Sequence, residues 1–124
     1  MKYTPAILPL CLLLAVCSGQ ETNLEQRVTG TWTQTKESTT VTMIYLPDSS
    51  FSVTTKTPDH TNFMAGTWQF KDGVIIMSVT NANTGNLRFI GQTLKCRVNS
   101  LKDHQLEYQN IYESVGPTNT FNRL

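Results

Sequence analysis

From Gly30 onward, the sequence is a succession of short segments in which apolar and polar residues alternate, separated by turn-forming residues. Alternation with a period of two is the pattern of a β-strand that buries one face. No part of this region shows the apolar periodicity of a long helix. The chain is therefore predicted to be an all-β domain, preceded by one short helical turn over residues 23–27.

Seven or eight strands are expected in this region. The clearest alternation or apolar character marks strands at residues 31–35, 39–46, 51–55, 64–70, 74–79, 94–99 and 106–109. A short apolar run over residues 87–90 is interpreted as a further strand. The tail around residues 118–121 is expected to add a last edge strand.

Short turns between consecutive strands favour an antiparallel up-and-down meander. Residues 47–50, Pro-Asp-Ser-Ser, form a turn signal because Pro fixes φ while Asp and Ser bond to nearby backbone. Asp72-Gly73 is a tight-hairpin signal because it accepts positive φ at low cost. Such a meander closes most simply into a barrel or half-barrel, which also removes exposed strand edges. A two-sheet β-sandwich is the alternative, because strand number does not separate the two architectures.

The triplet Gly-Thr-Trp occurs twice, at residues 30–32 and 66–68, each time at the start of a strand-like run. Glycine at such a point permits a bend or the close approach of another backbone. The tryptophan two residues later supplies a large apolar body with one N–H that needs a partner. Structural roles are therefore assigned to Gly30, Trp32 and Gly66.

The N-terminus has the pattern of a cleaved secretory signal. Lys2 provides a positive start, residues 6–16 are almost entirely apolar, and small residues follow up to Gly19. The apolar run is too short for a comfortable transmembrane helix. Ordinary cleavage would divide the chain into a signal peptide, residues 1–19, and one β-barrel domain, residues 20–124.

Residues 14–17, Leu-Ala-Val-Cys, offer an alternative processing site. They resemble a bacterial lipobox, in which the cysteine is lipidated and becomes the new N-terminus. Val16 departs from that pattern, because Gly, Ala or Ser usually precedes the cysteine. Lipidation of Cys17 would anchor the domain at a membrane surface, whereas ordinary cleavage would give a periplasmic or secreted protein. No second apolar run of spanning length follows, so the mature chain is expected to have no membrane-spanning segment.

Charge and cysteine content argue against several classes of function. Lys2 is one of 10 basic residues, so nine remain in the mature chain against 9 acidic residues. A neutral chain without a Lys/Arg cluster does not favour nucleic acid as a partner. Cys96 is the one cysteine beyond residue 17, so no intramolecular disulfide framework is available. Its alternation with Leu94 and Val98 predicts a buried structural thiol.

Residues suited to catalytic or metal chemistry are sparse. His60 and His104 each follow an aspartate in a predicted loop, and neither has a third ligand at metal spacing. No nucleophile elbow, phosphate-binding glycine loop or carboxylate pair suited to general acid–base work is present. The sequence therefore predicts a protein that is not an enzyme and has neither metal nor cofactor. An enzyme would require one of the histidines to lie in a concave pocket beside carboxylates.

A set of aromatic and methionine side chains has two interpretations. The aromatic members provide the bulk that a small β-domain needs for its core; they are Trp32, Tyr45, Phe51, Trp68, Phe70, Phe89 and Tyr108. Methionines fit equally well in an irregular core or in an adaptable pocket. If the barrel holds a ligand cavity, its lining is expected to include Met43, Tyr45, Met64, Trp68, Phe70 and Met77.

Taken together, these motifs resemble those of small bacterial lipocalin-like domains. Gly30-Thr31-Trp32 after a short helical turn is similar to the Gly-x-Trp signature of lipocalins. The layout continues through the turn at residues 47–51, the second Gly-x-Trp at 66–68, Asp72-Gly73, and a Leu-x-x-x-x-Leu element at 101–106. The resemblance covers nearly the whole mature chain. It departs from true lipocalins in length and in lacking their disulfide and an obvious Thr-Asp-Tyr loop motif.

The resemblance implies a small, exported β-barrel. It implies a ligand cavity less firmly, because small barrels can be filled by their own side chains. The expected function is an exported binding module for a small apolar ligand. The alternative is an envelope-associated structural or protein-interaction domain that has a filled core and contacts an envelope protein through its Thr/Asn-rich surface.

Overall fold

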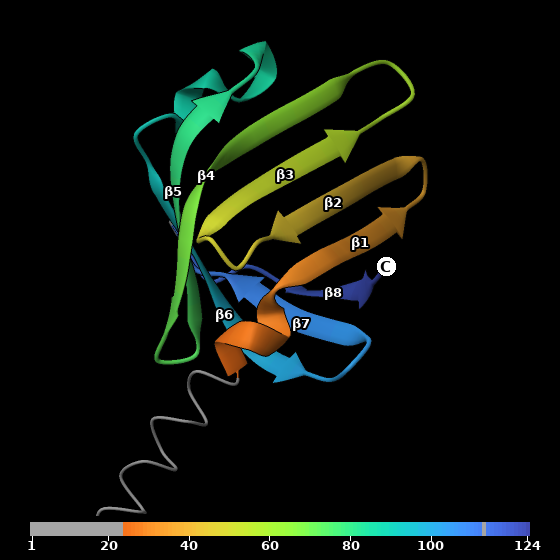
Figure 1. Ribbon diagram of the computed structural model, residues 1–124. Coiled ribbons are helices and arrows are strands. Elements are labelled where there is room, and N and C mark those ends of the chain that lie inside the picture. Colours follow the sequence, from red (N-terminus) through yellow and green to blue (C-terminus); the bar gives the residue numbers. More distant parts are fainter. Residues whose placement is uncertain (1–23, 113) are drawn as a thin grey trace, which may run out of the picture.

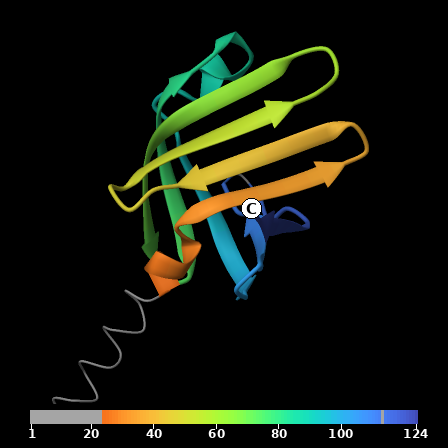
Figure 2. The same cartoon turned by 45° about the vertical axis from the view of Figure 1, so that its right-hand side comes forward.

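The computed structural model describes residues 24–112 and 114–124. The predicted signal peptide and both predicted processing sites, including Cys17, lie outside the described residues. Within them, eight antiparallel strands form a closed barrel in which every strand is hydrogen-bonded to its neighbours in sequence (Figures 1 and 2). The predicted all-β meander is confirmed, and the architecture is a barrel rather than a sandwich.

The last strand pairs with the first to complete the barrel. The strands are β1 (Gly30–Lys36), β2 (Thr39–Tyr45), β3 (Ser50–Lys56), β4 (Thr61–Lys71), β5 (Val74–Ala82), β6 (Thr93–Leu101), β7 (Gln105–Asn110) and β8 (Thr118–Arg123). A short helix over residues 24–28 precedes β1, and the 3₁₀ helix η1 (Thr84–Phe89) connects β5 to β6. Neither helical segment has the length and apolar character that a bilayer-spanning helix requires, in the part of the chain described.

Both turn predictions are confirmed. Asp48 accepts hydrogen bonds from the backbone N–H of Ser50 (2.9 Å) and from its hydroxyl (2.6 Å). The same two bonds lower the pKa of the Asp48 carboxyl. Asp72 and Gly73 both have positive φ, 53° and 76°, as a two-residue hairpin turn requires.

Two predictions about strands are wrong. Residues 87–90 are not a strand, because residues up to Phe89 belong to η1 and both Leu87 and Ile90 are exposed. An apolar run of four residues is too short to distinguish a strand from a helical turn. The tail is not an edge strand, because β8 pairs with β7 on one side and β1 on the other.

The alternating strand directions gather the connections at two ends of the barrel. The helix end carries the N-terminal helix, the turns after β2, β4 and β6, and the C-terminus. The loop end carries the connections after β1, β3, β5 and β7, which include η1. In Figure 1 the β1–β2 and β3–β4 hairpins point away from the N-terminal helix, so the two ends are well separated.

The core lies inside the barrel and consists of side chains that alternate inward along the strands. Every buried side chain in the described residues is hydrophobic. The buried state predicted for Cys96 is confirmed, since it is only 5% exposed. Of the predicted aromatic core, Phe89 and Tyr108 are partly buried against the cluster and the others are buried.

Trp32 and Arg123 close the helix end. Trp32 is fully buried, and its indole N–H donates to the carbonyl oxygen of Val28 at 2.8 Å. The Arg123 guanidinium lies 4.2 Å from the Trp32 ring centroid and donates to the carbonyl oxygens of Arg27 (2.6 Å) and Thr29 (2.9 Å). Carbonyls at a helix C-terminus lack partners within the helix, and a cation there also complements the helix dipole. Arg123 therefore joins β8 to the helix and to β1.

The two glycines of the repeated triplet occupy different environments. Gly66 is in the middle of β4 rather than at a strand start, at a bulge where the pairing with β5 shifts between Ala65 and Gly66. A Cβ there would overlap the backbone carbonyl oxygen of Ser78. Gly30 begins β1 with a φ of 135°, and a Cβ on it would meet the guanidinium of Arg123. Both positions therefore exclude a larger residue, for different reasons.

We expect Gly66→Ala to lower the free energy of unfolding by about 1–3 kcal/mol, because the backbone of β5 must move to make room for the methyl group. Urea denaturation measures this loss. Gly116→Ala is the matched control, since its Cβ would lie 3.5 Å from the nearest atom, an ordinary contact. The control should stay within about 0.5 kcal/mol of the parent. Equal effects of the two substitutions would contradict the steric explanation.

Candidate functional site in the barrel interior

The residues predicted to line a cavity belong to three strands whose inward faces share one barrel interior. They come from β2, β4 and β5, and all but one are buried in the common core. The buried members are Met43, Tyr45, Trp68, Phe70 and Met77. Met64 is partly buried and packs against the same cluster.

At the centre of the barrel, two tyrosine hydroxyls meet methionine sulfurs. The Tyr45 hydroxyl lies 3.6 Å from the Sδ atoms of both Met43 and Met77, which share its single proton as acceptors. The Tyr108 hydroxyl donates to Met43 Sδ, also at 3.6 Å. Burial raises the pKa of both phenols, so both are neutral donors over the physiological range. We call this group of four side chains the phenol–thioether cluster.

Neighbouring rings hold the two phenols in position. The Tyr45 ring packs against Trp68 with ring centroids 5.1 Å apart and a tilt of 59°. The Trp68 indole N–H is itself fixed by donation to the carbonyl oxygen of Leu46 at 3.0 Å. The Tyr108 ring stacks on Phe121 at 5.3 Å. Aromatic pairs of this kind restrain ring orientation. Each hydroxyl is therefore oriented toward Met43 Sδ by its own aromatic neighbour.

Phe70 lies apart from this cluster, near the helix end. It precedes the β4–β5 turn and borders a shallow cleft of about 220 Å³ together with Leu24 and Leu101. Its neighbour across the strand pair is Ile75, which is fully buried. Phe70 therefore belongs to the packing beneath the N-terminal helix, and the structure does not bring it to the two phenols.

Toward the loop end, inward-facing side chains become partly exposed. Val41 is two residues from Met43 on β2, and Val53 pairs with both Met43 and Met64 across the sheet. Val41, Val53 and Met64 are all partly buried, whereas Met43 is only 2% exposed. An inward-facing residue in a closed barrel gains exposure only where solvent enters the end of the barrel. We call this inward face, with Val41, Val53 and Met64 toward the loop end and the buried Met43 beyond them, the recess.

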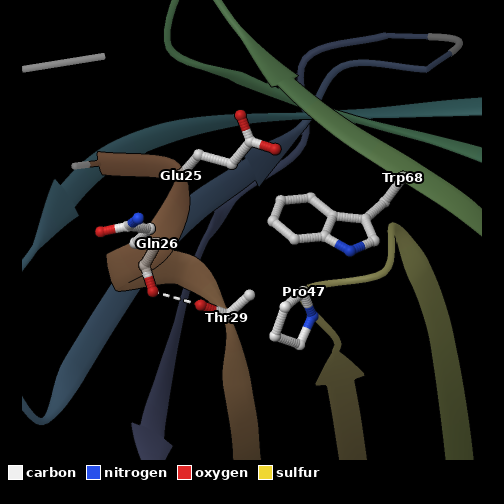
Figure 3. Close-up of a pocket in the computed structure, with 5 residues that line it drawn as sticks. All are labelled: Glu25, Gln26, Thr29, Pro47 and Trp68. Atoms are coloured by element: carbon white, nitrogen blue, oxygen red, sulfur yellow. Dashed lines mark hydrogen bonds between the residues drawn. The ribbon is translucent and has the colours of Figure 1, made fainter. Parts of the chain in front are cut away.

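A second concavity lies outside the barrel at the helix end (Figure 3). This cleft has a volume of about 420 Å³ and is lined by Glu25, Gln26, Thr29, Pro47 and Trp68. Trp68 points into it between the helix and the turn that contains Pro47. The indole is only 4% exposed, and the Thr29 hydroxyl is already donating to the carbonyl oxygen of Gln26. The cleft therefore offers one ring edge and one carboxylate, without convergent polar groups.

The two Asp-His pairs are separated by the fold. Asp59-His60 lies in the β3–β4 connection at the loop end, and Asp103-His104 lies in the β6–β7 turn at the helix end. All four residues are exposed. Among the residues that the structure describes, no group of three His, Cys, Asp or Glu side chains is placed to hold a metal ion.

The predicted lining included Met43 and Met64 but not Val41 or Val53, and it did not indicate how the tyrosines and methionines meet. Alternation along β2 places Val41 on the face of Met43 and Tyr45, and the same rule places Tyr108 inward on β7. No sequence signal indicated that the Tyr108 hydroxyl would reach Met43, since the two residues are 65 positions apart. That contact requires β2 and β7 to face each other across the closed barrel.

No protein-family model matches the chain, and no significant match was found among characterised proteins or solved structures. The up-and-down barrel is consistent with the fold that the lipocalin-like motifs implied.

We expect the protein to lose stability above about pH 9. Burial raises the pKa of the Cys96 thiol from 9.0 to about 12. Because the folded pKa is the higher one, the unfolded chain loses its proton first, and stability that is complete below pH 9 declines until about pH 12. One such group contributes a slope of about 1.4 kcal/mol per pH unit. The raised phenol pKa values of Tyr45 and Tyr108 act in the same direction above about pH 10.

Urea unfolding at about pH 7.5 and pH 9.7 tests this expectation. Cys96→Ala should remove much of the decline between these two values, because the tyrosines contribute little below pH 10. An unchanged decline in Cys96→Ala would show that another group is responsible.

Proposed function

We propose that the protein is an exported, non-catalytic binding module that takes a small apolar ligand into the barrel through the loop end. The main support for the proposal is that the inward-facing side chains toward the loop end are more exposed than Met43. Val41, Val53 and Met64 are partly exposed on the inward face, above the buried sulfur of Met43. An apolar recess with a few convergent polar groups is the usual form of a small-molecule site.

The side chains at the floor of the recess support this proposal. Met43 and Met77 are unbranched and polarizable, so they can adopt other rotamers when a ligand enters. The described residues place no charged side chain in the buried interior. Burying a charge without a partner costs several kcal/mol, so a neutral, apolar ligand suits this interior.

The loop end also carries exposed apolar side chains. Leu87 is 53% exposed and Ile90 is 44% exposed, both in or next to η1. Val115, in the connection between β7 and β8, is 64% exposed. The side chain of Asn83 holds the start of η1 to β4 by bonding to the backbone of Phe63 and Thr61. An apolar rim at the entrance would favour capture of an apolar ligand.

Export and a lipocalin-like identity are part of the same proposal. The signal pattern of residues 1–19 supports export, and the Gly-x-Trp motif supports the lipocalin-like identity. A filled-core interaction domain of the envelope is the competing function. The close packing of Met43, Met77 and Tyr45 inside the barrel favours this competing function, because a ligand would have to displace one of these side chains.

We expect the purified protein to bind the neutral fluorophore N-phenyl-1-naphthylamine with a rise in fluorescence. Val53→Trp should weaken binding at least about tenfold, because the larger ring fills the recess. Ser52→Trp is the matched control, since the adjacent residue on β3 faces outward, and it should bind like the parent. Circular dichroism and urea unfolding establish that both variants are folded. Absence of binding by the parent would support the filled-core interaction domain instead.

We expect the protein isolated from an exporting host to have lost its N-terminal residues. Intact-mass spectrometry should give either the polypeptide that starts at Gln20 or a chain that starts at Cys17 with a diacylglycerol-sized increment. The first result makes the protein periplasmic or secreted, and the second makes it a lipoprotein. Recovery of the uncleaved chain beginning at Met1 would contradict export through a cleaved signal.

A further inference from the structure

The phenol–thioether cluster contains two donors whose acceptors are weak. The Tyr45 hydroxyl is buried and that of Tyr108 is partly buried, and in the described structure their hydrogen bonds go to sulfur alone. A thioether is a poor acceptor compared with an oxygen. Two phenylalanines would supply the same apolar bulk without desolvating two hydroxyl groups. Packing alone therefore does not account for the hydroxyls, whereas a ligand acceptor does.

We propose that the ligand is a neutral molecule with one carbonyl-type oxygen at the end of an apolar body, and that this oxygen replaces Met43 Sδ as the acceptor of the Tyr45 and Tyr108 hydroxyls. The inference rests on the proposed function and specifies its ligand class. A carbonyl oxygen has two lone pairs and can accept from both phenols together. Exchange of a sulfur acceptor for an oxygen acceptor strengthens two buried hydrogen bonds at once.

The order of residues along β2 gives the route of the ligand. From the loop end inward, the strand presents Val41, then Met43, then Tyr45 on its interior face. Met43 thus lies between the partly exposed recess and Tyr45, and it contacts Tyr108 from β2. Its side chain has three rotatable bonds, so it can swing aside without moving the strand. The apolar body of the ligand would then occupy the recess beside Val41 and Val53.

The same geometry disfavours carboxylates and phosphates. Every buried side chain in the described part of the chain is uncharged, so an anion at the phenols would have no cation to compensate it. Arg123 does not supply this cation, because its guanidinium is held at the helix end by Trp32 and by backbone carbonyls. Two neutral hydroxyls do not offset the desolvation of a full charge in an apolar interior.

A pair of ligands of equal shape isolates the role of the oxygen. Nonan-2-one and 2-methylnon-1-ene differ only in the replacement of the carbonyl oxygen by a methylene group. Isothermal titration and two-dimensional NMR of the purified protein give the two affinities and the residues affected. We expect the ketone to bind at least about tenfold more tightly than the alkene, with the largest shifts at Met43 and at both tyrosines. Decanoate at neutral pH should bind at least about tenfold more weakly than the ketone.

Variants of the cluster give the second readout. Tyr45→Phe and Tyr108→Phe should each reduce the ratio of ketone affinity to alkene affinity. Tyr112→Phe is the matched control and should keep the full preference, because the Tyr112 hydroxyl bonds to Gln92 Oε1 at 2.6 Å, outside the cluster. Met43→Leu retains bulk but removes the competing sulfur, so it should increase the preference even if a tyrosine variant fails to fold.

The outcomes separate the two proposals. Equal affinity for the ketone and the alkene, or an unchanged preference in Tyr108→Phe, would overturn the acceptor inference while leaving an apolar binding module in place. Tighter binding of decanoate than of the ketone would also overturn it. If neither neutral probe shifts the recess residues, the proposed function itself fails.

Discussion

The barrel depends on the closure of β8 against β1, because this seam has the least backbone pairing. The ladder there pairs Trp32 with Arg123 and Thr33 with Asn122, and the Leu124 N–H adds a bond to the Thr31 carbonyl oxygen at 2.9 Å. By contrast, β1 pairs with β2 over seven residues. Side-chain contacts add to the sparse backbone pairing at the helix end, where the Arg123 guanidinium covers Trp32 and donates to backbone carbonyl oxygens. Farther along β1, the Gln34 side-chain amide donates to the carbonyl oxygen of Thr120 at 3.1 Å. An open seam would expose two strand edges and the indole together.

The two ends of the barrel differ in a way that suits a binding module. At the helix end, carbonyls without helical partners are satisfied by Trp32 and Arg123, and the ring of Trp32 is fully buried. At the loop end, interior positions such as Val53 stay partly exposed. The phenol–thioether cluster lies between these regions.

Much of the fold was predictable from the sequence because strand periodicity and turn chemistry are local. Asp72-Gly73 formed the expected hairpin turn, and residues 94–99 alternate as expected within β6. The errors arose where local pattern was short or where long-range pairing decided the outcome. Residues 87–90 were too few to separate strand from 3₁₀ helix. The bulge of β4 against β5 at Ala65 and Gly66 depends on pairing between strands, and the sequence does not mark it.

The sequence by itself determined an all-β chain, the inward face of its clearly alternating strands, and the buried apolar character of residues such as Met43 and Cys96. Side-chain alternation is a property of the extended backbone, so it can be read one strand at a time. Only the tertiary structure decided that the sheet closes, and that the hydroxyls of Tyr45 and Tyr108 meet at Met43. Strands remote in sequence face each other across a barrel at positions set by the tilt and stagger of all eight strands. No short segment carries that information.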